Sequence, residues 1–158
     1  MQITSTTLLR KSLALGAIAT LALAAGCSNM KSMGSGGVTS FGAALTSAAE
    51  VPPNSSSGSG TLEATLDKST NILKWKLVYS GLTGPATMAH FHGPAMAGVN
   101  AGVVVPFASA ASPSEGQATP TPAQVADLMD GKWYANVHTA VNPGGEIRGQ
   151  VTAKPSAP

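Results

Sequence analysis

Residues 132–152 read KWYANVHTAVNPGGEIRGQVT, in which two alternating segments flank a loop rich in Gly and Pro. Apolar and polar residues alternate with period two, the pattern of a half-buried β-strand, and so short a loop joins antiparallel strands. A slip of one residue would place Ile147 on the polar face, so the hydrophobic pattern fixes the register. With the turn centred near Asn142, three pairs of residues are predicted to face each other: Val137 and Ile147, Asn136 and Arg148, and His138 and Glu146.

The same alternation recurs in SFGAALTSA (40–48), TLEATLD (61–67) and NILKWKLVY (71–79), which are separated by runs of Gly, Pro and Ser. Strands with one buried and one solvated face are typical of antiparallel sheets. The apolar VVVPF (103–107) is interpreted as an interior strand that ends at Pro106. About seven strands in roughly 110 residues predict an all-β fold, a two-sheet antiparallel Greek-key sandwich of the immunoglobulin-like or superoxide-dismutase-like type.

One short helix is predicted at TPAQVADLMDG (121–131). Thr121 is its expected N-cap, with Pro122 at the first helical position and Gln124 completing a capping box. Gly131 supplies the left-handed residue that ends the helix. The apolar stripe, which we expect to pack over one end of the sandwich, consists of Val125, Leu128 and Met129.

The first 26 residues (1–26) have the layout of a secretory signal peptide, because Arg10 and Lys11 precede a short apolar run that ends LAAGC. This ending resembles a bacterial lipobox and predicts lipidation of Cys27. An ordinary signal peptide with an unpaired thiol, or a retained membrane anchor, are the alternatives. By resemblance to the sorting of Gram-negative lipoproteins, Ser28 after the cysteine favours the outer membrane.

The rest of the chain is predicted to hold one folded domain (38–152), preceded by the lipidated cysteine and a flexible tether (27–37) and followed by a disordered tail (153–158). Two of the nine basic side chains lie in the signal peptide, which leaves seven basic and seven acidic side chains in the mature chain. This balance provides no basic surface for nucleic acid. A single cysteine also excludes a disulfide within the domain.

Four motifs occur in the order of a known domain family: AAEVPP (48–53), AHFHGPAMAGVNAGVVV (89–105), GKWYANVHT (131–139) and NPGGEIRGQV (142–151). Together they resemble the chordin-type, or CHRD, domain from about Phe41 to Val151. The resemblance implies an extracytoplasmic β-rich module, of the kind found in bacterial secreted proteins and lipoproteins. Such domains are also repeated in chordin, an extracellular antagonist of bone morphogenetic proteins. The resemblance implies no established reaction.

We therefore expect a non-catalytic binding or structural module that its lipid anchors in the membrane of the cell envelope, on the periplasmic or the surface side. Its partner is expected to be another envelope protein, an extracellular protein or a polysaccharide. This interpretation requires no cofactor.

Six polar side chains are predicted to lie on the outward faces of their strands. In AHFH, Ala89 and Phe91 point inward, so the two histidines of this motif point outward. If this strand neighbours the hairpin of residues 132–152, the six side chains form one polar patch. Its members are His90, His92, His138, Asn136, Glu146 and Arg148.

The first interpretation of this patch is a hydrogen-bonded network that stabilises the strand register. Asn136, Glu146 and Arg148 would be its structural members. An imidazole donates from one nitrogen and accepts at the other, and Arg148 can donate to Glu146 or to a backbone carbonyl.

The second interpretation is a metal site. The spacing of His90 and His92 places both imidazoles on one face of a strand, and His138 from a neighbouring strand completes a set of three nitrogens. Glu146 would be a fourth ligand or a hydrogen-bond partner of a ligand, and such a set suits zinc or copper(II). Met88 falls on the same face, and with Met96 nearby it adds a copper(I) carrier to the alternatives.

The third interpretation is an enzyme similar to copper–zinc superoxide dismutase, because HFHG is similar to the histidine pair of that β-sandwich. That enzyme needs more than the three histidines of this chain, and a structural disulfide that one cysteine cannot form. The serines lie in loops without the motif of a nucleophile. No catalytic residue is therefore assigned.

Overall fold

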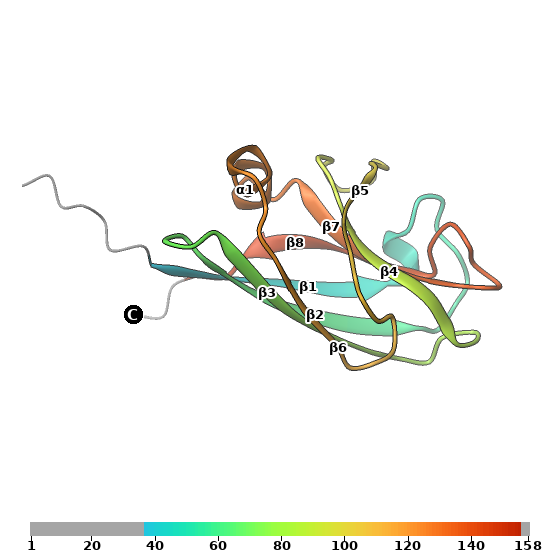
Figure 1. Cartoon of the computed structure of the whole chain (residues 1–158). Coiled ribbons are helices and arrows are strands. Elements are labelled where there is room, and N and C mark those ends of the chain that lie inside the picture. Colours follow the sequence, from blue (N-terminus) through green and yellow to red (C-terminus); the bar gives the residue numbers. More distant parts are fainter. Residues whose placement is uncertain (1–36, 156–158) are drawn as a thin grey trace, which may run out of the picture. The chain divides into compact units, whose positions relative to one another are not determined.

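The strands of the domain form one antiparallel sheet in the computed structural model, which describes residues 37–155 (Figure 1). The predicted signal peptide, Cys27 with most of the tether, and the last three residues of the tail lie outside the described residues. No helix within residues 37–155 is long and apolar enough to cross a membrane. The elements are β1 (Val38–Thr46), the 3-10 turn η1 (Ser47–Ala49), β2 (Ser59–Asp67), β3 (Ile72–Ser80), β4 (Ala86–His92), β5 (Val103–Pro106), β6 (Ser114–Ala118), α1 (Pro122–Met129), β7 (Trp133–Thr139) and β8 (Ile147–Ala153).

The hydrogen-bonded order of the strands is β5-β4-β7-β8-β1-β2-β3-β6, and all neighbours run antiparallel. The predicted all-β class with one short helix is thus confirmed. The predicted division into two sheets is not observed, because the described strands form a single sheet that curls into a nearly closed barrel. The curling brings distant strands together: Trp75 of β3 lies edge-on to Phe91 of β4, with ring centroids 5.3 Å apart, and stacks on Phe107.

The alternating apolar residues line the inside of this curled sheet, as the period of two predicted. Burying a Val, Leu, Ile or Phe side chain stabilises a fold by about 1.5–3 kcal/mol. Apart from alanines, the fully buried apolar side chains of the sheet are Phe41, Leu45, Leu62, Leu66, Leu73, Leu77, Phe91, Trp133, Val137, Ile147 and Val151, and Leu128 of α1 is fully buried as well.

Two strands differ from the prediction. VVVPF forms β5, which is an edge strand that pairs with β4 alone among the described strands, and not an interior strand. Val103 is accordingly 52% exposed. The strand β6 (SEGQA) was not predicted, because its polar and small residues show no apolar alternation and its pairing with β3 rests on backbone hydrogen bonds.

The register of the β7–β8 hairpin is confirmed for two of the three predicted pairs. The prediction that His138 pairs with Glu146 is wrong, because the backbone N–H of Glu146 donates instead to the carbonyl of Val137, at 2.7 Å. Glu146 therefore lies before the first ladder pair of β8, not within the strand. The confirmed pairs are Val137 with Ile147 and Asn136 with Arg148.

The helix α1 begins and ends as predicted. The N–H of Gln124 donates to the hydroxyl of Thr121, and the N–H of Thr121 donates to the side-chain oxygen of Gln124, which closes the capping box. Gly131 follows with a φ of +70°. Leu128 is fully buried and α1 lies against β8, whereas Met129 is 39% exposed, so only part of the predicted apolar stripe reaches the core.

The first and last strands of the domain are neighbours. Phe41 of β1 lies opposite Ala153 of β8, and the N–H of Lys154 donates to the carbonyl of Ser40 at 2.8 Å. Because the two strands run antiparallel, the start of β1 and the end of β8 lie at the same end of the sheet (Figure 1).

The outer face of β7 is buried as well as its inner face. All seven residues of this strand are buried, so the prediction of a solvated outward face is wrong here. Loops 47–58, 93–102 and 140–146 cover this face. The hydroxyl of Tyr134 donates to the carbonyl of Ala101, the ring of His138 lies 2.9 Å from the carbonyl oxygen of Pro143, and Ser56 of the first loop donates to Glu146 of the third. The result is an outer polar layer of buried side chains: Glu50, His92, Tyr134, Asn136, His138, Glu146 and Arg148.

Candidate metal centre

The ladder between β4 and β7 sets three rungs of side chains on the outer face of the sheet. Successive residues of a strand point to opposite faces, so residues two apart share a face. The core residue Phe91 lies between two of these rungs and points inward. From one end to the other, the rungs are Met88 with His138, His90 with Asn136, and His92 with Tyr134.

The structure brings the three histidines together. One ring nitrogen from each of His90, His92 and His138 lies within 4.8 Å of the others. The closest pair is Nδ1 of His90 and Nε2 of His138, at 3.2 Å. His92 and His138 are buried, at 8% and 6% exposure, whereas His90 is partly exposed, so the cluster opens to solvent on the side of His90.

Backbone carbonyls hold the rings of two histidines. Nδ1 of His92 lies 3.0 Å from the carbonyl oxygen of Ala101, and Nδ1 of His138 lies 2.9 Å from that of Pro143. A carbonyl oxygen only accepts, so each Nδ1 carries the proton and each Nε2 presents its lone pair. Nε2 of His92 is buried and has no hydrogen-bond partner among residues 37–155. Metal-binding histidines commonly have this arrangement.

The pKa values of the two closest histidines favour neutral rings. Burial lowers the pKa of His90, and the neighbouring His138 and His92 lower it further. Burial also lowers the pKa of His138, and this effect exceeds the opposing hydrogen bond to the carbonyl of Pro143. A neutral imidazole is the form that binds a metal ion.

Asn136 lies at the rim of the histidine cluster. Its side-chain Oδ1 lies 3.0 Å from Nε2 of His138, the nitrogen without a proton. Two acceptors so close require a shared partner: the amide turned so that its NH₂ group donates, or a cation between them. Asn136 therefore contacts the candidate ligands directly, in addition to its place in the ladder.

Glu146 does not lie with the histidines. Its carboxylate is fully buried and accepts hydrogen bonds from the hydroxyls of Ser56 (2.6 Å), Thr83 (2.6 Å) and Thr139, and from the N–H of Thr83 (2.7 Å). Burial raises the pKa of Glu146, but these hydrogen bonds outweigh it and lower the pKa to about 2. The expected role of Glu146 as a fourth ligand is thus not supported, because its oxygens instead join loop 47–58, the segment between β3 and β4, and the end of β7.

Arg148 makes the second of its two expected contacts, the one with a backbone carbonyl. Its guanidinium donates to the carbonyl of Val99 (2.6 Å) and the side chain of Asn100 (2.9 Å), and not to Glu146. It lies 3.4 Å from the ring centroid of Tyr134, which in turn stacks on His92 with ring centroids 4.8 Å apart. The buried Arg148 therefore stabilises the loop whose Ala101 carbonyl holds His92.

Glu50 is a member of the outer polar layer that the sequence analysis did not identify. It is 4% exposed, and its Oε1 has no hydrogen-bond partner in the described part of the chain. Burial raises its pKa to about 7, against the lowering effects of Arg148, the N–H of Val51 and Asn136. Gly145 makes room for the carboxyl, since a Cβ there would clash with Oε1 of Glu50. The AAEVPP motif was the available signal, but its prolines indicated only a turn.

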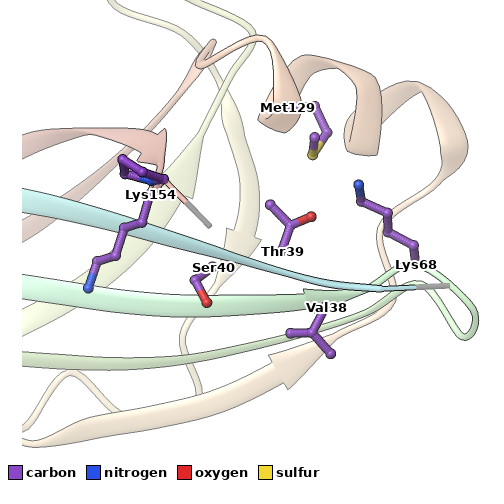
Figure 2. A pocket seen from close by; sticks show the side chains of 7 residues that line it. Val38, Thr39, Ser40, Lys68, Met129 and Lys154 are labelled. Atoms are coloured by element: carbon purple, nitrogen blue, oxygen red, sulfur yellow. The ribbon is translucent and has the colours of Figure 1, made fainter. Parts of the chain in front are cut away.

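A separate cavity of about 670 Å³ lies at the end of the sheet where β1 begins (Figure 2). Among residues 37–155, neither a histidine nor a carboxylate lines it. The lining side chains include two lysines, one on each side of the start of β1 in Figure 2. They are Val38, Thr39, Ser40, Lys68, Met129, Lys154 and Pro155.

The fold and the site define a curled antiparallel β-domain with three convergent histidines beneath covering loops. The model of the CHRD domain family matches residues 41–151, a range that contains every member of the outer polar layer. The chain belongs to the CHRD domain family, which confirms the resemblance of its motifs. No curated protein and no solved structure matches the chain.

Proposed function

We propose that this protein is a non-catalytic CHRD-domain module of the cell envelope that binds one transition-metal ion, zinc or copper, through His90, His92 and His138. One observation carries the proposal. Three imidazole nitrogens converge within 4.8 Å, and two of the rings are held by backbone carbonyls in the form that presents Nε2. Three histidines with an open fourth position suit zinc and copper.

Metal binding is tested by titrating zinc into the full chain by calorimetry. The chain is purified in detergent with Cys27→Ser, so that its thiol cannot bind the ion. We expect one zinc ion per chain. Loss of a hydrogen-bond partner of a ligand already weakens binding by about 10–100-fold, so His90→Ala/His138→Ala is expected to weaken it by about 100-fold or more. The control Asp127→Ala/Asp130→Ala removes two carboxylates near α1 and leaves binding unchanged.

Thermal unfolding distinguishes metal binding from a purely structural role of the histidines. A ligand that binds only the folded state stabilises it by about 2.7 kcal/mol at 100 times its Kd. The wild type is therefore expected to gain thermal stability with zinc, and the double histidine variant is not. Equal zinc affinity in the two proteins, or no zinc-dependent stabilisation of the wild type, would contradict the proposal.

Anchoring is proposed from the sequence alone, because LAAGC at residues 23–27 resembles a lipobox and Ser28 follows the cysteine. Cells fed a clickable fatty acid are expected to incorporate it into the wild-type protein, and Cys27→Ala is expected to carry no label. The label tests only whether Cys27 is lipidated. Sorting to the outer membrane is tested separately, by separating inner and outer membranes and measuring which of them contains the labelled protein. A label that persists in Cys27→Ala would exclude this cysteine as the acceptor.

A further inference from the structure

Met88 shares the outer face of β4 with His90 and His92 and lies directly opposite His138 in the ladder. Residues opposite each other in an antiparallel pair have Cβ atoms about 4.5–5.5 Å apart. Methionine is unbranched and has three rotatable side-chain bonds, so its sulfur reaches over a neighbour at this distance. The thioether of Met88 is therefore within reach of an ion held by the three histidines.

Packing in the core does not account for Met88. Its side chain is 47% exposed, whereas the next residue, Ala89, points inward and is 1% exposed. A methionine usually stabilises a fold by filling a gap in a core, and a residue exposed to this extent does so only weakly. Apolar burial thus leaves the position of Met88 unexplained.

The fourth position at the histidine cluster has two candidate donors of different chemistry. Asn136 offers an amide oxygen, which is a hard ligand, and Met88 offers a thioether, which is a soft one. Glu146 cannot compete, because Ser56, Thr83 and Thr139 already occupy its oxygens. Zinc and copper(II) accept an oxygen or water in the fourth position, whereas soft thioether ligands select copper(I).

We propose that the site selects copper(I), which is bound by His90, His92 and His138 and by the sulfur of Met88 as fourth ligand. The inference rests on the proposed metal-binding function and names its ion. Met88 and His90 are the accessible members of the set, and His92 and His138 are the buried ones. The ion enters on the side of Met88 and His90 and is then held by the nitrogens fixed to Ala101 and Pro143.

The test compares two metals on the same proteins, each the full chain with Cys27→Ser in detergent. Copper(I) affinity is measured without oxygen by competition with a chromogenic copper(I) chelator, and zinc affinity by calorimetry. Loss of one weak ligand is expected to change affinity by about tenfold. Met88→Leu, which keeps the size of an exposed side chain, is therefore expected to weaken copper(I) binding by about tenfold or more and to leave zinc binding unchanged.

Met96→Leu is the matched control, because Met96 is 61% exposed on the loop that covers the layer and has no place in the β4–β7 ladder. It is expected to change neither affinity. X-ray absorption of the copper(I) form should show a sulfur neighbour in the wild type and in Met96→Leu, and none in Met88→Leu. Copper(I) binding that is equal in Met88→Leu and wild type would overturn the inference. If zinc still binds in that case, the proposed function stands. If the wild type binds neither copper(I) nor zinc, both the proposed function and this inference are wrong.

Discussion

Replacing Glu146 by alanine is expected to lower the free energy of unfolding by about 3 kcal/mol, because each hydrogen bond to a buried charged group contributes about 1.5–3 kcal/mol and the contributions do not add fully. The fully buried carboxylate accepts hydrogen bonds from Ser56, Thr83 and Thr139, and the variant leaves all three hydroxyls without this partner. Urea unfolding of the metal-free protein measures the change.

An exposed glutamate provides the control for this prediction. Glu115 pairs with Lys76 at 2.8 Å, and both side chains are more than half exposed. Exposed pairs contribute about 0–1 kcal/mol, so Glu115→Ala is expected to change stability little. If the two variants unfold at the same urea concentration, the hydrogen bonds of Glu146 to Ser56, Thr83 and Thr139 do not stabilise the fold.

The pH dependence of Glu146 follows from its lowered pKa. The folded value of about 2 lies below the ordinary value of 4.5. The unfolded chain therefore binds the proton more readily, and the stabilisation by Glu146 is present above pH 4.5 and lost as pH falls toward 2. The stability of Glu146→Ala is expected to fall less steeply than that of the wild type over this range.

Glu50→Gln is expected to become more stable than the wild type as pH rises from 4.5 to 7. The folded pKa of Glu50 is raised to about 7 from 4.5, so the folded state holds the proton that the unfolded chain loses. The wild type is therefore destabilised across this window, by up to about 3 kcal/mol at 1.36 kcal/mol per pKa unit. Glutamine does not titrate, so the variant does not lose stability through this position as pH rises.

The Glu50 prediction is read from the difference between two melting curves. Both proteins are unfolded in a metal chelator at pH 4.5 and at pH 8, and His90 and His138, present in both, cancel in the comparison. Glu63→Gln is the control, because Glu63 is an exposed partner of Lys154 whose pKa is lowered by that lysine's hydrogen bond and charge. A constant difference between Glu50→Gln and wild type at the two pH values would show that folding does not raise the pKa of Glu50.

Local patterns were sufficient to predict the helix and the strands with apolar alternation, but not β6, which has none. The alternation around Val137 and Ile147 predicted their pairing, because only one register buries both side chains. The cap of α1 was predicted because Thr121 and Gln124 lie three residues apart and need no distant partner. The shared face of His90 and His92 likewise follows from strand geometry alone.

Distant contacts could not be predicted in the same way. Glu146 receives its hydrogen bonds from Ser56 and Thr83, which lie 90 and 63 residues earlier in the chain, so no local pattern shows them. Tyr134 occupies a position that alternation assigns to solvent, but it is buried by the guanidinium of Arg148, the ring of His92 and the loop that contains Ala101. The closure of the sheet depends on aromatic contacts such as that between Trp75 and Phe91, which join strands that are not paired.

The pairing of β1 with β8 makes the domain suitable as an insert. Phe41 and Ala153 face each other across these strands, so the chain enters and leaves the domain at nearly the same point. A unit with adjacent ends can be placed in a surface loop of another protein, or joined head to tail with further copies, without stretching either partner. Inserting the whole domain into a host protein would therefore transfer the histidine cluster together with the loops that cover it.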